Sequence, residues 1–239
     1  MFEDLQYLLK PKYHALWADY CRYLELGWQH FNDANRATAT KYEQLRLLET
    51  AIRRDFPLKE NLLARLQRHF VAENLSLYLL LDPLSAWRYA ASGKTPESET
   101  ALTEIVQRAV APAARLLMVL NDENPSTYLP MTSFLTALFL EQLQTQKSPL
   151  LQNVKRSKKQ WCRKYDGLLK NAFVLLGIVG SKRLKFKLAM ALNAMKVKIG
   201  KIVNNKQPTA ELLDRVKIFW YAVFQFITVR RRTTTQKGL

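Results

Sequence analysis

The amino-acid sequence predicts an all-α protein, a single-domain helical bundle spanning residues 1–239. Three observations support this fold class. Seven glycines in 239 residues are too few for the turns of an all-β or doubly wound α/β chain. Apolar residues recur at helical spacings of three and four. With 48% hydrophobic and 11% aromatic residues, the composition is that of a folded protein.

Proline marks the expected helix starts, because a missing N–H costs nothing in the first helical turn. The clearest start is Thr95-Pro96-Glu97-Ser98-Glu99, with a capping hydroxyl, a proline at the first helical position and carboxylates in the first turn. Asp82-Pro83 and Asn124-Pro125 repeat this arrangement. The expected helices cover about 13–31, 38–54, 58–80, 84–92, 97–121, 127–146, 150–178, 182–204 and 209–230.

The helix expected at 182–204 has a core-facing stripe with apolar residues on its opposite side as well. The stripe consists of Leu184, Leu188, Ala191, Leu192, Met195, Ile199 and Ile202. Phe186, Met190 and Val197 lie opposite, so we expect this helix to contact something besides the core beneath it.

Positive charge is concentrated in the last third of the chain. The whole sequence has 37 Lys and Arg against 20 Asp and Glu, a formal charge of +17. Residues 1–150 are near neutral, with 16 basic and 17 acidic residues, whereas residues 151–239 have 21 basic and 3 acidic residues, a net charge of +18. This asymmetry favours an anionic partner, either a phosphate backbone or lipid headgroups, over a surface that is basic for solubility alone.

The sequence lacks the motifs of several classes of protein. Cys21 and Cys162 are far apart without metal-ligand spacing, so neither a disulfide framework nor a zinc module is indicated. There is no glycine-rich phosphate loop and no nucleophile elbow, and the three histidines lack metal-ligand spacing. The N-terminus does not read as a signal peptide, and no apolar run reaches 18 residues. We therefore expect a cytoplasmic protein, with peripheral association at the inner face of a membrane as a further expectation.

The middle of the chain resembles the squalene and phytoene synthase family. The similarity lies in LLARLQRHFVAEN at 62–74, AWRYA at 86–90 and ALTEIVQRAVAPAARLLMVL at 101–120. By the order of elements it extends over roughly residues 40–230. Phe70 and Glu73 match a Phe-x-x-Asp element, and Ala109, Pro112, Ala114 and Arg115 match an Ala-x-Pro-x-Gly-Arg-like one. The resemblance implies the isoprenoid synthase fold and a ligand pocket that includes Arg22, Phe70, Pro112 and Arg115.

Members of that family hold magnesium against two prenyl diphosphates with paired aspartates on facing helices. The matching segments here, CRYLELGWQHFND at 21–33 and TSFLTALFLEQLQTQ at 132–146, retain Arg22, Glu25 and Glu141 but not the aspartate pairs. Glu25, Glu73 and Glu141 are degenerate acidic positions: they either converge on one cavity and bind an ion weakly, or are ordinary exposed helix glutamates. We favour the second interpretation, hence a catalytically degraded protein with no cofactor. An active transferase with atypical acidic ligands, requiring Mg²⁺, is the minority alternative.

Pro112 also has a physical interpretation that is independent of the resemblance. It falls inside the helix expected at 97–121, where proline removes a hydrogen bond and kinks the axis. A kink either opens a pocket between helices or adjusts packing, and the sequence favours neither.

Two partner classes fit the basic region. The first is an anionic membrane surface or a partner protein, with a prenyl or other lipid ligand. Its contact residues are Lys182 and Lys185, together with Phe219, Trp220, Arg230, Arg231 and Arg232 of the aromatic segment 218–232. In this segment, a buried C-terminal core helix is an equally good interpretation. The second class is nucleic acid, bound through KRSKKQWCRK at 155–164 and SKRLKFK at 181–187 with Trp161 and Phe186 stacking on bases. We favour the membrane or scaffold role.

Overall fold

Helices form every regular element that the computed structural model describes, which confirms the all-α prediction. The structure describes residues 2–33, 35–54, 61–145, 151, 154, 158–203, 218, 219, 221 and 222. In chain order its elements are η1 (Glu3–Leu8), η2 (Pro11–Tyr13), α1 (His14–Asn32), α2 (Thr38–Arg54), α3 (Leu62–Ala72), α4 (Tyr78–Leu81), α5 (Leu84–Ala91), α6 (Glu99–Val119), η3 (Pro125–Thr127), α7 (Tyr128–Thr145), α8 (Lys158–Phe173), α9 (Leu175–Ile178) and α10 (Lys182–Val203).

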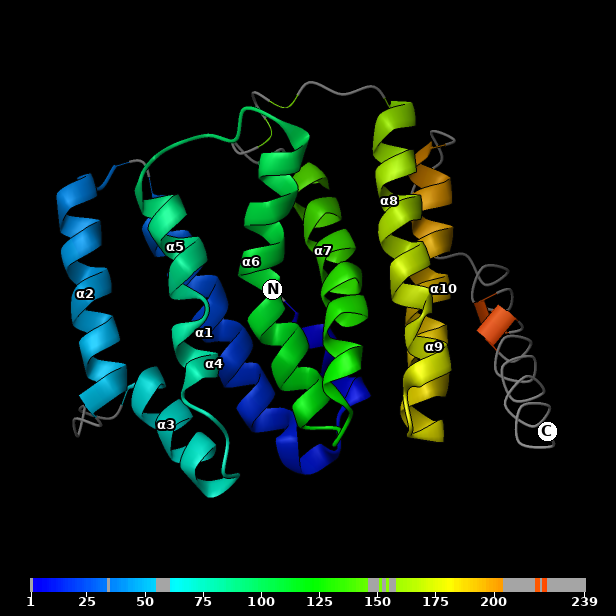
Figure 1. The fold of residues 1–239 in the computed structure, drawn as a ribbon, viewed down its shortest axis with the longest axis horizontal. Coiled ribbons are helices and arrows are strands. Elements are labelled where there is room, and N and C mark those ends of the chain that lie inside the picture. The colour runs from blue at the N-terminus through cyan, green and yellow to red at the C-terminus, as the bar shows by residue number, and fades with distance from the viewer. Residues whose placement is uncertain are drawn as a thin grey trace.

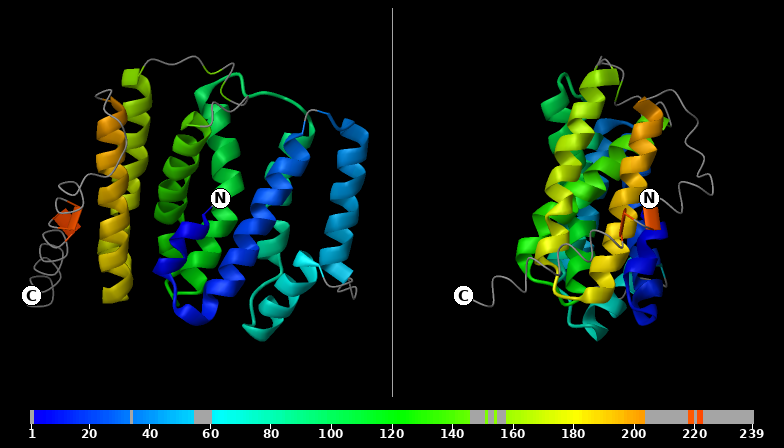
Figure 2. Two further views of the ribbon diagram at one scale, coloured as in Figure 1. Left: turned by 180° about the vertical axis from the view of Figure 1, so that it is seen from behind. Right: turned by 90° about the vertical axis from the view of Figure 1, so that its right-hand side faces the viewer.

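The long helices stand side by side along the long axis of the molecule (Figure 1). α2 forms one end of the row and contacts α5. α6 and α7 pack together in the middle, and α8 and α10 form the other end. The view from behind shows the same order (Figure 2). The hairpin of α8, α9 and α10 packs on the rest of the molecule mainly through α8 against α7, and α10 and α9 also contact η1 and η3.

One hydrophobic core connects the near-neutral and basic parts of the chain. Its fully buried side chains include Trp17, Trp87 and Phe134 from the first part and Leu188 and Leu192 from the second. In the stripe expected on α10, Leu184, Leu188, Leu192, Met195 and Ile199 are buried, Ala191 is half-buried and the side chain of Ile202 is outside the described part.

The segment expected to be one helix at 58–80 is two helices, and this prediction was wrong. α3 ends at Ala72 because Asn74 adopts a left-handed backbone, φ 52°. The N–H of Leu75 then bonds to the carbonyl of Phe70 at 2.7 Å and that of Asn74 to Val71 at 3.1 Å, the hydrogen bonds of a Schellman C-cap.

The start of α6 also differs from its prediction. The capping residue is Ser98, whose hydroxyl accepts from the Ala101 N–H at 3.2 Å, and the helix begins at Glu99. The expected cap at Thr95 was wrong by one turn. By contrast, the Asn124 side chain accepts from the Ser126 N–H at 2.9 Å ahead of α7, as its sequence predicted.

The sequence predictions at the chain termini have mixed outcomes. The first expected helix, at 13–31, is α1, but η1 and η2 precede it and were not expected. The helix expected at 209–230 falls mostly outside the described residues; of its positions 218, 219, 221 and 222 are described, and they are helical.

Candidate functional site

The tip of the α8–α10 hairpin exposes apolar side chains between two lysine-rich helices. Val174, just after α8, is 51% exposed, and Ile178, at the end of α9, is 38% exposed. Their neighbours Leu175, Leu176 and Val179 are buried. The exposed pair therefore lies on the solvent side of a short helix whose opposite side packs into the core.

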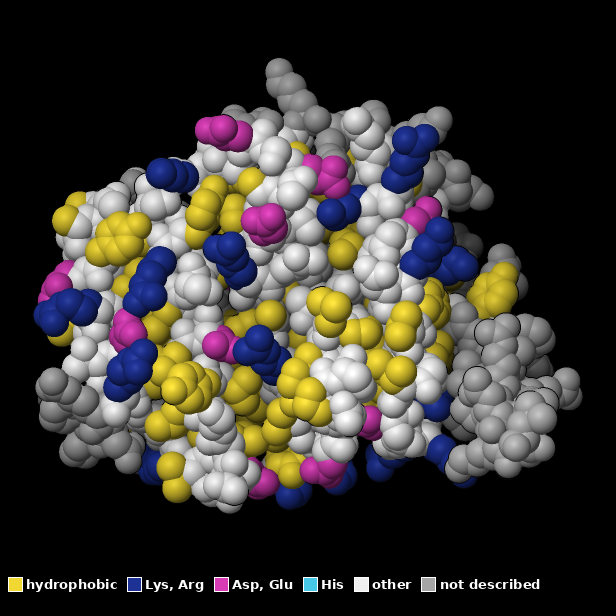
Figure 3. Space-filling view, in the orientation of Figure 1, with side chains coloured by type: hydrophobic (Ala, Val, Ile, Leu, Met, Phe, Trp, Pro, Cys, Tyr) yellow, Lys and Arg dark blue, Asp and Glu magenta, His cyan; other side chains and the backbone are white. Residues whose placement is uncertain are grey.

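Basic side chains flank this exposed pair. Lys170 on α8 and Lys182 and Arg183 on α10 are exposed, and Lys185 is half-buried. Figure 3 shows Lys and Arg side chains over the upper part of α8 and again at the lower edge of the molecule, with hydrophobic side chains between them. We call Lys170, Val174, Ile178, Lys182, Arg183 and Lys185 the hairpin tip.

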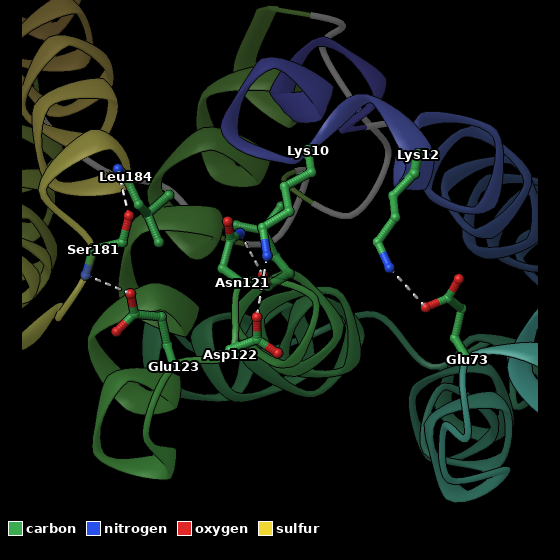
Figure 4. A network of polar contacts seen from close by, with 9 residues as sticks. Lys10, Lys12, Glu73, Asn121, Asp122, Glu123, Ser181 and Leu184 are labelled. Carbon is green, nitrogen blue, oxygen red and sulfur yellow. Dashed lines mark hydrogen bonds and ion pairs between the residues drawn. The ribbon is translucent and has the colours of Figure 1, made fainter.

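The backbone of the hairpin tip is held by a carboxylate from the turn between α6 and η3. Glu123 accepts hydrogen bonds from the Gly180 N–H at 2.8 Å and from the Ser181 N–H at 3.1 Å, of which Figure 4 labels the second pair. The Ser181 hydroxyl in turn caps α10 by accepting from the Leu184 N–H at 3.3 Å. These bonds fix the direction in which α10 leaves the turn.

Further ion pairs tie the N-terminal segment to the same end of the molecule. Lys10 pairs with Asp122 at 3.2 Å and Lys12 with Glu73 at 3.4 Å (Figure 4). Asp122 and Glu73 are therefore already paired with lysines of the N-terminal segment.

The charge of the hairpin is compensated unevenly. Higher on the hairpin, Lys164 pairs with Glu99 at 3.4 Å and Lys198 with Glu141 at 2.9 Å. Lys187 donates to the backbone carbonyl of Tyr7, and burial, with a smaller contribution from Arg183, lowers the Lys187 pKa. Within the described ranges, no carboxylate forms an ion pair with Lys182, Arg183 or Lys185, although the Glu123 carboxylate is bound to the backbone just before them.

The three acidic positions have separate partners. Glu25 accepts from the Gln29 amide at 3.3 Å, and Glu73 pairs with Lys12. Glu141 is buried rather than exposed, accepts from Lys198, and also accepts from the Thr145 hydroxyl at 3.0 Å. In the part of the chain that the structure describes, no group of three or more acidic, histidine or cysteine side chains could hold a metal ion, so the three glutamates do not form one.

The residues expected to line a ligand pocket contact other protein groups. Arg22 is exposed on α1, the buried Phe70 ring lies 6.0 Å from that of Tyr20, and Arg115 forms an ion pair with Asp82. Pro112 is buried inside α6, as its position in the sequence predicted.

Two cavities are lined by other side chains. One of about 400 Å³ lies beside Glu141 and Lys198, where η1, α7 and α10 meet, and one of about 310 Å³ lies among α1, α2, α3 and α5. Neither lining includes Arg22, Phe70, Pro112 or Arg115.

The expected membrane-contact segment is described only in part. Phe219 is 47% exposed, and its ring meets that of Phe186 on α10 edge to face at 6.3 Å. This contact agrees with the expectation that α10 touches something on its second apolar side. Trp220, Arg230, Arg231 and Arg232 lie outside the described residues.

Sequence reasoning missed Val174 and Ile178. The expected helix at 150–178 treated them as ordinary helical residues, whereas the chain breaks at Val174 and again at Val179. No spacing signal in AFVLLGIVG at 172–180 separates them from the buried residues, because Ile178 is three residues from the buried Leu175 and would share its helix face.

Comparison with known proteins identifies no relative. No protein-family model, curated protein or solved structure matches this chain. Of the helices that the structure describes, none combines the length and the apolar character needed to cross a membrane.

Proposed function

We propose that this protein binds an anionic membrane surface through the hairpin tip. The observation that carries the proposal is the exposure of Val174 and Ile178 between Lys170 and the Lys182-Arg183 pair, on a turn braced by Glu123. Exposed apolar side chains surrounded by lysine and arginine suit the boundary between lipid headgroups and acyl chains.

The expected free energy of membrane binding is that of reversible association. Each basic residue near an anionic surface contributes about 1 kcal/mol, so the four cations of the tip give roughly 4 kcal/mol at low salt. Val174 and Ile178, which are 51% and 38% exposed, add about 1–3 kcal/mol when inserted into the interface. The first contribution falls with ionic strength and the second does not, because salt screens charges and leaves apolar transfer unchanged.

We also propose that this chain, which resembles squalene and phytoene synthases in sequence, has no catalytic role. Two of the acidic positions that the resemblance singles out, Glu73 and Glu141, are ion-paired to Lys12 and Lys198. A carboxylate engaged by a lysine is a poor magnesium ligand, because the ammonium group competes for the same oxygens. These pairs support a role in lipid association or assembly, at the inner face of a membrane, over prenyl transfer.

Nucleic acid is the competing partner. It requires aromatic side chains that are free to stack on bases. The Trp161 ring lies 6.1 Å from that of Tyr165, and Phe186 contacts Phe219, so both candidate rings already contact other rings. The apolar pair at the hairpin tip has no function in phosphate binding, which favours the membrane.

Co-sedimentation with vesicles tests the proposal. We expect the protein to sediment with phosphatidylcholine vesicles containing phosphatidylserine but not with pure phosphatidylcholine, and binding to weaken without vanishing as salt rises. Lys182→Gln with Lys185→Gln should reduce the salt-sensitive part by about tenfold, corresponding to roughly 1–2 kcal/mol. Lys94→Gln with Arg108→Gln is the matched control, because both side chains are exposed on other elements.

The apolar part of the binding is tested separately. Val174→Ser with Ile178→Ser should remove the salt-resistant remainder, while Leu47→Ser with Val71→Ser, which are more exposed and lie on α2 and α3, should leave it intact. Tight binding to duplex or single-stranded nucleic acid with a steep salt dependence, and no vesicle binding, would replace the membrane with nucleic acid.

A further inference from the structure

The cavity of about 400 Å³ where η1, α7 and α10 meet has a lining that mixes charged, polar and apolar side chains. The lining consists of Phe2, Asp4, Leu5, Leu138, Glu141, Gln142, Thr145 and Lys198. Small-molecule sites usually have volumes of about 300–1,000 Å³ and combine apolar walls with a few polar groups. The size and the lining of this cavity therefore suit a small organic ligand.

The charged groups of the cavity leave one carboxylate without a partner. Glu141 and Lys198 form an ion pair at 2.9 Å and neutralise each other. Asp4 is exposed, and within the described residues it forms no ion pair. Two carboxylates against one ammonium group give the lining a formal charge of −1. Because salt screens more distant charges beyond about 8 Å, this local charge favours a cationic ligand although the whole chain is basic.

The cavity also offers hydrogen-bond acceptors to a ligand. The Glu141 side chain is 9% exposed, and its oxygens accept from Lys198 at 2.9 Å and from the Thr145 hydroxyl at 3.0 Å. A carboxylate has about four lone-pair sites, so these two bonds do not use all of them. The carbonyl of the Gln142 amide is a further acceptor in the lining. Together with Asp4, these groups match the three N–H donors of a primary ammonium group.

Apolar side chains form the rest of the lining, and we call Phe2, Leu5 and Leu138 the apolar wall. Phe2 and Leu5 are buried, and the Phe2 ring packs edge to face on that of Phe139 at 6.3 Å. A metal ion gains nothing from such a wall, and in the described part of the chain no group of three or more acidic, histidine or cysteine side chains could hold one. The lining therefore suits an organic cation better than a metal ion.

We propose that this cavity binds a small organic monocation, a primary amine that carries an apolar group. The ammonium group pairs with the exposed carboxylate of Asp4 and donates to the remaining acceptors, while the apolar group contacts the apolar wall. The amine comes from solution rather than from a bilayer, because Lys198 follows Lys182 by sixteen residues on α10, about 24 Å along the helix. The proposal is therefore independent of membrane binding by the hairpin tip.

Calorimetric titration of the purified chain at neutral pH with three probes tests this site. Phenethylamine is a cation, phenethyl alcohol is neutral and phenylpropionate is an anion, and all three carry the same aromatic group. We expect saturable binding of one phenethylamine per chain. Phenethyl alcohol should bind about tenfold more weakly, because it lacks the charge-assisted hydrogen bonds, and phenylpropionate should not bind detectably.

Two pairs of variants separate the carboxylate from the apolar wall. Asp4→Asn should weaken phenethylamine by about tenfold and leave phenethyl alcohol unchanged. Glu3→Gln is the matched control, because it removes the same charge from the neighbouring exposed residue, which does not line the cavity. Leu138→Ala should weaken both probes by about threefold, whereas Leu129→Ala, exposed on the same helix and outside the lining, should weaken neither.

Several outcomes would overturn the proposal. They are undetectable phenethylamine binding, tighter binding of phenylpropionate, and equal effects of Asp4→Asn and Glu3→Gln, which would mean unspecific attraction by charge. Tighter binding of phenylalanine than of phenethylamine would also contradict a monocation, because it would show that Lys198 binds a ligand carboxylate. Asp4 and Glu3 are both exposed, so their variants should fold, which far-ultraviolet circular dichroism would verify.

Discussion

Lys198 of α10 donates a 2.9 Å hydrogen bond to the buried carboxylate of Glu141 on α7, and this ion pair joins the basic part of the chain to the near-neutral part. The Glu141 side chain is only 9% exposed, whereas that of Lys198 is 42% exposed. The two partners therefore contribute unequally, because only the carboxylate would be left without solvent if the pair were broken.

Lys198→Ala should lower the free energy of unfolding by about 1–3 kcal/mol, since it leaves the Glu141 charge buried with only the Thr145 hydroxyl. Adding Glu141→Gln should restore part of the loss, and urea unfolding measures both. Lys196→Ala, at an exposed position two residues away, is the control and should stay within about 0.5 kcal/mol of wild type. Equal effects of the two lysine variants would show that the pair contributes nothing.

Gly27 permits the close approach of α1 and α5. A Cβ at this position would lie 2.1 Å from Cζ2 of Trp87, whose ring is itself buried. Gly27→Ala should therefore destabilise the protein by about 1–3 kcal/mol, against the usual gain for this change in a helix. Gly167→Ala on α8 has nothing within 4 Å of the added atom and should stabilise by about 0.5–1 kcal/mol. Thermal melts of both variants check the opposite signs.

Asn74 ends α3 with its left-handed backbone, and its substitution tests that cap. Asn74→Gly should be neutral or slightly stabilising, whereas Asn74→Val should cost about 1–2 kcal/mol, because a β-branched residue is strained at φ 52°. Both changes are read from urea unfolding. An equal cost for glycine and valine would mean that the Asn74 side chain, and not the backbone conformation, is what matters.

The sequence was informative where one local rule decides the structure and weak where tertiary contacts decide it. The stripe on α10 predicted its buried face, and the range 38–54 matched α2, because hydrophobic periodicity alone specifies these features. The break at Asn74 was missed, since asparagine is tolerated in both helices and left-handed caps. The N-cap of α6 was also predicted at the wrong residue. Thr95 and Ser98 both fit the local capping pattern, so the sequence alone does not decide between them, and Ser98 is the cap in the structure.

The residues of the candidate site were harder to predict from the sequence than the helices were. The basic excess of residues 151–239 lies in the third of the chain that contains the charged part of the proposed surface. Which apolar residues face solvent depends on how α9 packs against its neighbours, and no spacing rule covers a four-residue helix. The pairing of Glu141 with Lys198 joins residues 57 apart in the chain, so it depends on the tertiary fold.

Asp19 on α1 and Arg65 on α3 give the stability a specific pH dependence. Two hydrogen bonds from Arg65, at 2.9 and 3.0 Å, hold the pKa of the Asp19 carboxyl below its ordinary value of 3.8. A carboxyl with a lowered pKa stabilises the folded state above its unfolded pKa, and this stabilisation is lost as the pH falls through the folded pKa. The relevant window therefore begins near pH 4 and extends below it.

Asp19→Asn should reduce the loss of stability between pH 6 and pH 3 by about 0.5–1 kcal/mol, a modest value because solvent screens the half-exposed Arg65. Urea unfolding at the two pH values measures it, and carboxyls such as Asp33 and Glu43, whose pKa values are also lowered, contribute equally to both proteins. An unchanged pH dependence in the variant would assign the acid sensitivity to those other groups.

The central claim, insertion of the hairpin tip into an anionic bilayer, is tested most directly by an environment-sensitive fluorophore placed on it. Ile178→Cys in a Cys162→Ser background provides one reactive thiol, because Cys21 is buried and burial raises its thiol pKa to about 12. With a nitrobenzoxadiazole label at position 178, we expect a blue-shifted, stronger emission when phosphatidylserine vesicles are added, and no change with the label at Leu47→Cys. Vesicle binding without any emission change at position 178, or with the change at position 47 instead, would contradict the account.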